Sequence, residues 1–310
     1  MAGSTTPRRN KARGITDQPG RRAERNATFA LRCSWLLLPA TLAPLIGNLL
    51  HHADTPAHTA TSVVLWSVWA LVLTTSLIPL PSTLTVLRIA GPGVLVLAVW
   101  SGVNADDGVW TAVGILNALL AAVTAFTAPV ADRFVDGASY GDERRFLLRA
   151  PGPVALVLGP LTTAVTVTGA ILGPALIVDG RGIVGVGATI VGWSLAAITA
   201  RALYRLGRRW VVLVPAGFVL HDHLALAEPT LLQRAGLERI TAAPFDTDAL
   251  DLTQRARGLA LEVRCRKPHD LLPVGARGAA EIVGAEALLC SPARPDVVLA
   301  EAARRRLPTG

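Results

Sequence analysis

Six stretches of this chain carry no Asp, Glu, Lys or Arg, and each is about long enough to cross a lipid bilayer. They all lie between residues 33 and 200, and they cover residues 33–50, 59–87, 89–105, 108–131, 150–178 and 182–200. A membrane-spanning helix needs about 20 mainly apolar residues, within a range of about 17–25. The stretches therefore predict six transmembrane helices, with a cleaved signal peptide as the alternative for the first stretch alone.

A Leu-Arg pair precedes every second stretch, at Leu31-Arg32, Leu87-Arg88 and Leu148-Arg149. The eleven residues that begin at Leu87 align without a gap to the eleven that begin at Leu148, and seven positions are identical. This repetition predicts an all-α membrane bundle built from three hairpins of one orientation. Such a repeat is parallel, related by an axis along the membrane normal.

Basic residues are concentrated in alternate connections between the stretches. Arg is frequent before the first stretch, in residues 132–149 and after residue 200, and Arg88 separates the second stretch from the third. The alternate loops, His51–Thr59, Val103–Gly108 and Asp179–Gly182, together hold only Arg181. Because cytoplasmic loops carry the excess of Lys and Arg, we expect both termini in the cytoplasm of a multi-pass plasma-membrane protein.

The same topology predicts a role for the three arginines of the repeat. Arg32, Arg88 and Arg149 would lie at the cytoplasmic membrane interface, where a long side chain reaches the headgroups. The alternative for Arg88 is a functional charge within the membrane. Gly91-Pro92-Gly93 and Pro151-Gly152-Pro153 follow two of these arginines and are typical of helix starts, with functional kinks as the alternative.

The regions outside the stretches differ in composition. Residues 1–28 combine Arg with Gly, Ser, Thr and Pro, which is typical of a disordered tail. Residues 29–204 then form the membrane domain. In residues 205–310 charged residues are common and apolar residues alternate, as at 259–266, which predicts half-buried strands. A helix is expected to begin at Pro295 and to close this domain.

The run from Arg209 to Asp222, RWVVLVPAGFVLHD, and the later Leu231-Leu232-Gln233-Arg234 are similar to bacterial pleckstrin-homology-like (PH-like) domains. The resemblance covers about residues 205–308, although the Trp or Phe expected within the closing helix is absent. It implies a small β-rich cytosolic domain with a C-terminal helix, attached to membrane helices, which binds or scaffolds and has no catalytic residues. All but two of the 30 basic residues are Arg, which indicates GC-rich codon usage and an actinobacterial source.

Histidine supplies only weak candidates for a metal site. A zinc site needs three or four ligands, and neither small group of histidines is completed at a recognisable spacing. The candidates are His51, His52 and His58 in the first outer loop, and His221 and His223 in the C-terminal domain. We expect no bound metal and no cofactor.

Two amides lie within the predicted spans. Asn48 and Asn117 are expected to form hydrogen bonds between helices, with the lining of a solute pathway as the alternative. The three cysteines, Cys33, Cys265 and Cys290, form no C-x-x-C pair, so the sequence indicates neither a zinc site nor a redox motif.

The chain contains no Ser-His-Asp set, Walker loop, dinucleotide-binding glycine motif or H-E-x-x-H motif. We therefore expect a non-enzymatic membrane protein. Its PH-like domain would bind a protein partner or anionic inner-leaflet lipid, and we expect no nucleic acid as a partner. The alternative is a small-solute transporter or channel built from the repeated hairpins.

Overall fold

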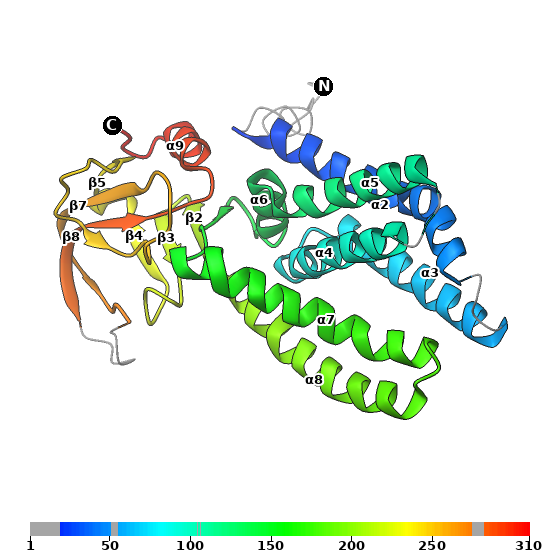
Figure 1. Cartoon of the computed structure of the whole chain (residues 1–310). Coiled ribbons are helices and arrows are strands. Elements are labelled where there is room, and N and C mark those ends of the chain that lie inside the picture. The colour runs from blue at the N-terminus through cyan, green and yellow to red at the C-terminus, as the bar shows by residue number, and fades with distance from the viewer. Residues whose placement is uncertain (1–18, 51–54, 104, 106, 275–281) are drawn as a thin grey trace, which may run out of the picture. The chain divides into compact units, whose positions relative to one another are not determined.

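The structure, a computed structural model, describes residues 19–50, 55–103, 105, 107–274 and 282–310. The chain divides into two compact units (Figure 1). The helical unit comprises Thr28–Ser139 and Ala150–Arg209. The β-rich unit comprises Tyr140–Arg149, Trp210–Gly310 and the described residues of Met1–Ala27.

Long apolar helices make up the helical unit. They are α2 (Arg21–Leu50), α3 (Thr55–Leu77), α4 (Pro81–Val103), α5 (Gly108–Phe126), α7 (Gly159–Val178), which a π-helical turn η1 (Val154–Leu158) precedes, and α8 (Gly182–Leu206). A short helix α6 (Ala128–Asp136) follows α5. Six segments in the described part of the chain are long and apolar enough to cross a membrane. The number of predicted spans is confirmed, and the protein is a multi-pass membrane protein.

The outer surface of these helices is apolar. Trp100 and Ile198 are exposed over 63% and 67% of their surfaces, and Ile183 over 93%. Large contiguous apolar surfaces are uncommon on soluble monomers. Their presence here is explained by contact with the lipid bilayer.

Two helices begin earlier than the sequence patterns indicate. Helix α2 begins at Arg21, inside the region expected to be a disordered tail. Gly20 turns the chain there with φ of 76°, and Glu24 lies in the first turn, where the helix dipole favours a carboxylate. The remainder of the expected tail, residues 1–18, lies outside the described residues.

Helix α4 begins at Pro81, so Gly91-Pro92-Gly93 lies inside it and is not the expected helix start. Gly91 has a packing role there, since a Cβ at this position would lie 2.9 Å from the Cα of Ala122 in α5. In the third hairpin the helical turns do begin at Gly152, as the Pro151-Gly152-Pro153 pattern predicted.

Helices α7 and α8 lie side by side (Figure 1), and their backbones come close together at several glycines. A Cβ on Gly169 would lie 2.6 Å from the carbonyl oxygen of Gly192, and a Cβ on Gly192 would clash with the carbonyl oxygen of Gly169. One turn further along α7, a Cβ on Gly173 would clash with the backbone and the hydroxyl group of Thr189. Small residues spaced one turn apart let two membrane helices approach closely, and Gly169 and Gly173 have this spacing in α7.

The β-rich unit contains two four-stranded sheets and a C-terminal helix. The first sheet has the order β1-β2-β3-β4, and all its strands are antiparallel. The second has the order β5-β7-β8-β6, in which only β6 is parallel to its neighbour. The elements are β1 (Arg144–Leu147), β2 (Trp210–Val214), β3 (Gly217–His221), β4 (Thr230–Gln233), a 3-10 turn η2 (Arg234–Gly236), β5 (Leu237–Ala242), β6 (Leu250–Asp251), β7 (Leu261–Leu271), β8 (Val283–Cys290) and α9 (Pro295–Arg304).

A single core joins the two sheets and the helix. Phe218 of the first sheet, Val263 of the second and Val298 of α9 all belong to it and are fully buried. The alternating strand expected near residues 259–266 and the closing helix from Pro295 are both present.

Strand β1 comes from the connection between α6 and α7, far from the rest of its sheet in sequence. It pairs antiparallel with β2, with Phe146 opposite Val211, and Phe146 is fully buried. The expected domain boundary at residue 205 leaves this strand among the membrane helices. A segment of four residues carries too little periodicity to be recognised as a strand from sequence.

The β-rich unit is assembled from three separate segments of the chain, and this constrains the membrane topology. Its segments are separated by four candidate spans before Tyr140 and by two more between Arg149 and Trp210. Segments that fold together must lie on one side of the membrane, so each separation must contain an even number of spans. The two separations contain four and two candidate spans, so all three segments can lie on the same side of the membrane.

The contribution of β1 can be measured on fragments. We expect residues 205–310 alone to be less stable, by about 3–5 kcal/mol, than the same residues joined by a Gly/Ser linker to residues 140–149. The fragment without β1 loses Phe146 from its core and exposes the edge of β2. Urea unfolding followed by circular dichroism measures the difference. Equal midpoints would show that β1 contributes nothing.

Candidate functional site

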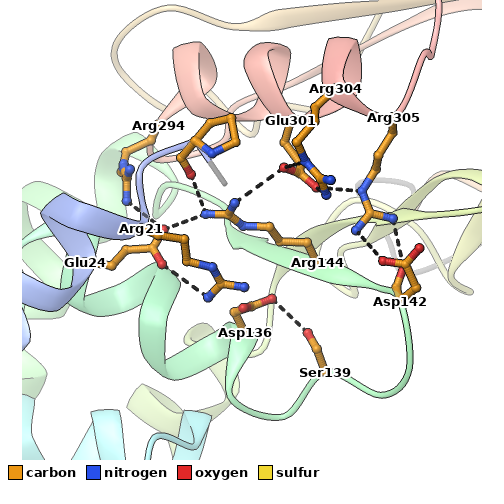
Figure 2. A network of polar contacts seen from close by, with 11 residues as sticks. Arg21, Glu24, Asp136, Ser139, Asp142, Arg144, Arg294, Glu301, Arg304 and Arg305 are labelled. Carbon is orange, nitrogen blue, oxygen red and sulfur yellow. Dashed lines mark hydrogen bonds and ion pairs between the residues drawn. The ribbon is translucent and has the colours of Figure 1, made fainter. Parts of the chain in front are cut away.

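Arg144 is a buried charged group of the β-rich unit with partners on two other segments of the chain (Figure 2). Its Nη2 donates to Oε1 of Glu24 at 2.8 Å and to the carbonyl oxygen of Pro19 at 2.7 Å. Its Nη1 lies 3.5 Å from Oε2 of Glu301. The side chains of Arg144, Glu24 and Glu301 are at most 1% exposed. One guanidinium on β1 therefore joins the first turn of α2 to the C-terminal helix α9.

Further arginines surround each of the two buried carboxylates. Oε1 of Glu24 also accepts a hydrogen bond from Nη1 of Arg294 at 3.2 Å, and its Oε2 lies 3.4 Å from Nη1 of Arg21. Glu301 accepts hydrogen bonds from Nε of Arg304, at 2.8 Å to its Oε2, and from Nε of Arg305, at 2.7 Å to its Oε1. Charge-assisted hydrogen bonds of this kind are stronger than neutral ones.

Arg305 also contacts Asp142, which lies just before β1. Nη1 of Arg305 donates to the carbonyl oxygen of Asp142 at 2.8 Å, and the Asp142 carboxylate lies 3.4 Å from Nη2 of Arg305. Residues 140–149 are thus held at both Asp142 and Arg144. We call the set Glu24, Asp142, Arg144, Arg294, Glu301, Arg304 and Arg305 the arginine network.

The network keeps Glu301 ionised. Burial acts to raise the pKa of this carboxyl, but the hydrogen bonds from Arg304 and Arg305, with the charges of Arg304 and Arg144, outweigh it. The pKa of Glu301 therefore lies below its ordinary value. The ionised Glu301 attracts Arg144 and so fastens β1 to α9.

Arg32 and Arg88, two of the three repeat arginines, make the same kind of contact in the helical unit. Nε and Nη2 of Arg32 donate to the carbonyl oxygen of Ser76 at 3.1 and 3.0 Å. Nε of Arg88 donates to the carbonyl oxygen of Ala125 at 3.3 Å. Ser76 and Ala125 are the penultimate residues of α3 and α5, so each arginine lies on the first helix of a hairpin and caps the end of the second.

Both carbonyl groups need such a donor. The last carbonyls of a helix have no partner within the helix. The group that would normally donate to Ala125 is the N–H of residue 129, and Pro129 has none. Arg88 also lies 5.6 Å from the centre of the Phe126 ring, and Asp132 in α6 attracts its charge. A cation is favoured at a helix C-terminus.

Arg149, the third repeat arginine, belongs to the β-rich unit and has different partners. Its Nη1 donates to the carbonyl oxygen of Leu259 at 2.8 Å, and its Nη2 donates to that of Ala293 at 3.3 Å. The difference arises because Arg149 follows β1 as extended chain, whereas the other two arginines lie within helices.

Asn117 joins two helices of the helical unit. Its Nδ2 donates to the carbonyl oxygen of Ser34 at 3.2 Å and to Oγ1 of Thr41 at 3.0 Å, both in α2. This is the interhelix hydrogen bonding expected for it. The side chain of Asn48 lies outside the described residues.

The histidines that the structure describes are not gathered into a metal site. His221 stacks on Trp210 with ring centres 4.9 Å apart, His223 is exposed beyond the end of β3, and His58 is exposed on α3. No group of three His, Cys, Asp or Glu side chains within the described ranges is arranged to hold a metal ion. His51 and His52 lie outside those ranges.

Two cysteines are core residues of the β-rich unit. Burial raises the pKa of the Cys265 thiol, and burial together with the negative charge of Asp222 raises the pKa of Cys290 to about 12. Thiols with raised pKa values are poor nucleophiles because the reactive form is the thiolate.

The arginine network was missed by the sequence patterns. Arg144 contributed there only to the count of basic loop residues. A signal existed, because Arg144 alternates with the apolar Phe146 and Leu148 and so shares their inward face.

The comparisons with known proteins found no match among family models, curated proteins or solved structures.

Proposed function

We propose that this chain is a non-enzymatic plasma-membrane protein whose β-rich unit is a PH-like binding module at the cytoplasmic face. The observation that carries the proposal is the construction of this unit. Arg144 fastens three chain segments that lie before, between and after the membrane helices. A module built in this way is held permanently at the membrane surface.

The topology supports the PH-like assignment. An antiparallel four-stranded sheet is followed by a second sheet and by a C-terminal helix whose Val298 enters the shared core. This order agrees with the outline expected from the resemblance of residues 205–308. Strand β1 completes the first sheet and lies outside that range.

The chemistry of the charged groups supports binding over catalysis. The buried carboxylates of the arginine network are engaged by guanidinium groups, and Cys265 and Cys290 have raised pKa values. Catalytic sites use groups whose pKa values lie near the working pH. The close backbone contact of Gly169 and Gly192 likewise favours an anchoring role for the third hairpin over a solute pathway through it.

The assignment of the cytoplasmic side can be tested with reporter fusions. Fusions after Pro81, Gly141 and Gly310 should report a cytoplasmic position, and fusions after Asp54, Asp106 and Arg181 an external one. The reason is the concentration of Arg in the segments on the first side. An external report from the Gly310 fusion would reject the topology.

The binding role is tested by proximity labelling in cells, with a biotinylating enzyme fused after Gly310. Wild type and Arg145→Met should label the same neighbours, whereas Arg144→Met, in which the module is destabilised, should lose specific ones at equal insertion. An unchanged set would reject the module as a binding element. A solute flux that survives in Arg144→Met would favour the transporter alternative.

A further inference from the structure

The loop between β6 and β7, Thr253–Leu259, presents two arginines to solvent. Arg255 and Arg257 are both exposed, and neither guanidinium has an ion-pair partner among the residues that the structure describes. Leu259 beside them is 51% exposed. The loop therefore offers two cations and one apolar side chain together, the combination that suits the interface between headgroups and acyl chains.

The backbone of this loop is strained in a way that presents these side chains. Gln254 and Arg255 have φ values of 55° and 57°, and the N–H of Ala256 donates to the carbonyl oxygen of Thr253 at 3.1 Å. Gly, Asn or Asp usually occupies both central positions of such a turn, because larger side chains are unfavourable at positive φ. Strained residues are concentrated at binding sites, where the surrounding structure holds them in place.

Arg149 holds the far end of the loop. Its Nη1 binds the carbonyl oxygen of Leu259, and its guanidinium fills the space beside Gly258, where a Cβ would lie 2.7 Å from Nη1. Gly258 has φ of 103°. The loop is thus fastened to the residue that leads into the fifth candidate span.

This attachment limits the distance between the loop and the bilayer. The helical turns that lead into the membrane begin at Gly152, three residues after Arg149, and the candidate span begins at Val154. Three extended residues reach at most about 11 Å. This limit follows from the chain alone and applies to Arg149, whose side chain binds the Leu259 end of the loop.

We infer that the Thr253–Leu259 loop docks on the anionic phospholipid headgroups of the leaflet beside it. Arg255 and Arg257 would bind the phosphate and acidic groups, and Leu259 would enter the apolar boundary below them. The inference rests on the proposed function in one respect, because it takes the β-rich unit to face the anionic cytoplasmic leaflet.

The test measures hydrogen exchange of residues 253–260 in the full-length protein, reconstituted in nanodiscs. Discs of phosphatidylcholine alone are compared with discs that contain phosphatidylglycerol. We expect exchange to be about fivefold slower or more in the anionic discs, since one basic residue near such a surface contributes about a fivefold change in binding. High salt should reverse the protection, because it screens these charges.

Matched variants locate the effect. Arg255→Gln/Arg257→Gln should lose the protection, whereas Arg266→Gln/Lys267→Gln, which removes two other exposed basic residues of the β-rich unit, should keep it. Equal exchange in both kinds of disc would overturn the inference. So would the same protection from inorganic phosphate in phosphatidylcholine discs, because the ligand would then be a free anion.

The result can be separated from failure of the proposed function. Both leaflets of a disc have the same composition, so the exchange experiment does not depend on which side the β-rich unit faces in the cell. The reporter fusions decide that side independently. Cytoplasmic reports with no lipid-dependent protection would reject the loop assignment alone.

Discussion

Arg144→Met should lower the free energy of unfolding of the β-rich unit by about 3–5 kcal/mol. The substitution removes the one guanidinium that Glu24 and Glu301 share, and both carboxylates remain buried. Glu24 keeps Arg21 and Arg294, and Glu301 keeps Arg304 and Arg305, all of which are more exposed than Arg144. Removal of one member of a buried ion pair is costly mainly because the other charge remains buried. Pulse proteolysis of the full-length protein in urea, with cleavage followed in the β-rich unit, measures the loss.

Arg145→Met is the matched control for this variant. Arg145 is the next residue of β1, but its ion pair with Glu143 is about one-fifth exposed on both sides. A partly exposed pair contributes about 1 kcal/mol or less. A loss in Arg145→Met as large as that in Arg144→Met would contradict a special role for the arginine network.

The effect of Arg144→Met should also depend on pH. The pKa of Glu301 is below its ordinary value in the folded protein, so this group stabilises the fold above about pH 4.3 and loses its contribution as the pH falls through the folded value. Protonation of Glu301 also removes a buried charge that has lost the attraction of Arg144 in the variant. The difference between wild type and variant should therefore shrink under acidic conditions, and a difference that grows would contradict the assignment.

Gly192→Leu should prevent α7 and α8 from packing as a hairpin. The added side chain would meet the backbone of Gly169, which cannot move aside as a flexible side chain can. Even Gly192→Ala should cost about 1–3 kcal/mol through overpacking. Gly187→Leu on the same helix is the control, because no heavy atom lies within 4 Å of a Cβ built there.

Cysteine cross-linking measures this packing directly. Oγ1 of Thr166 in α7 donates to Oγ1 of Thr199 in α8 at 2.7 Å, so Thr166→Cys/Thr199→Cys in a Cys33→Ser background should form a cross-link in high yield. The yield should remain high with Gly187→Leu and fall sharply with Gly192→Leu. Equal yields in the two variants would show that the glycine contact does not hold the hairpin.

The sequence by itself determined the membrane character of this protein and several of its elements. A helix in lipid must be apolar along its whole length, so each of the six spans is visible in its own residues. The strand expected near residues 259–266 and the helix from Pro295 also follow from local periodicity and capping. The resemblance to PH-like domains implied a small β-rich domain with a C-terminal helix, and the structure contains a β-rich unit with α9 near its C-terminal end.

Only the tertiary structure decided which distant segments meet. Arg144 and Glu24 are 120 residues apart. Alternation with Phe146 and Leu148 indicates that Arg144 is buried, but nothing in the sequence near it identifies Glu24 as its partner. The same holds for the repeat arginines: Arg32 and Arg88 cap the ends of neighbouring helices, whereas Arg149 fastens a loop of the β-rich unit. A local pattern records whether a residue suits water, lipid or a core, but the partner of a charge depends on how the whole chain folds.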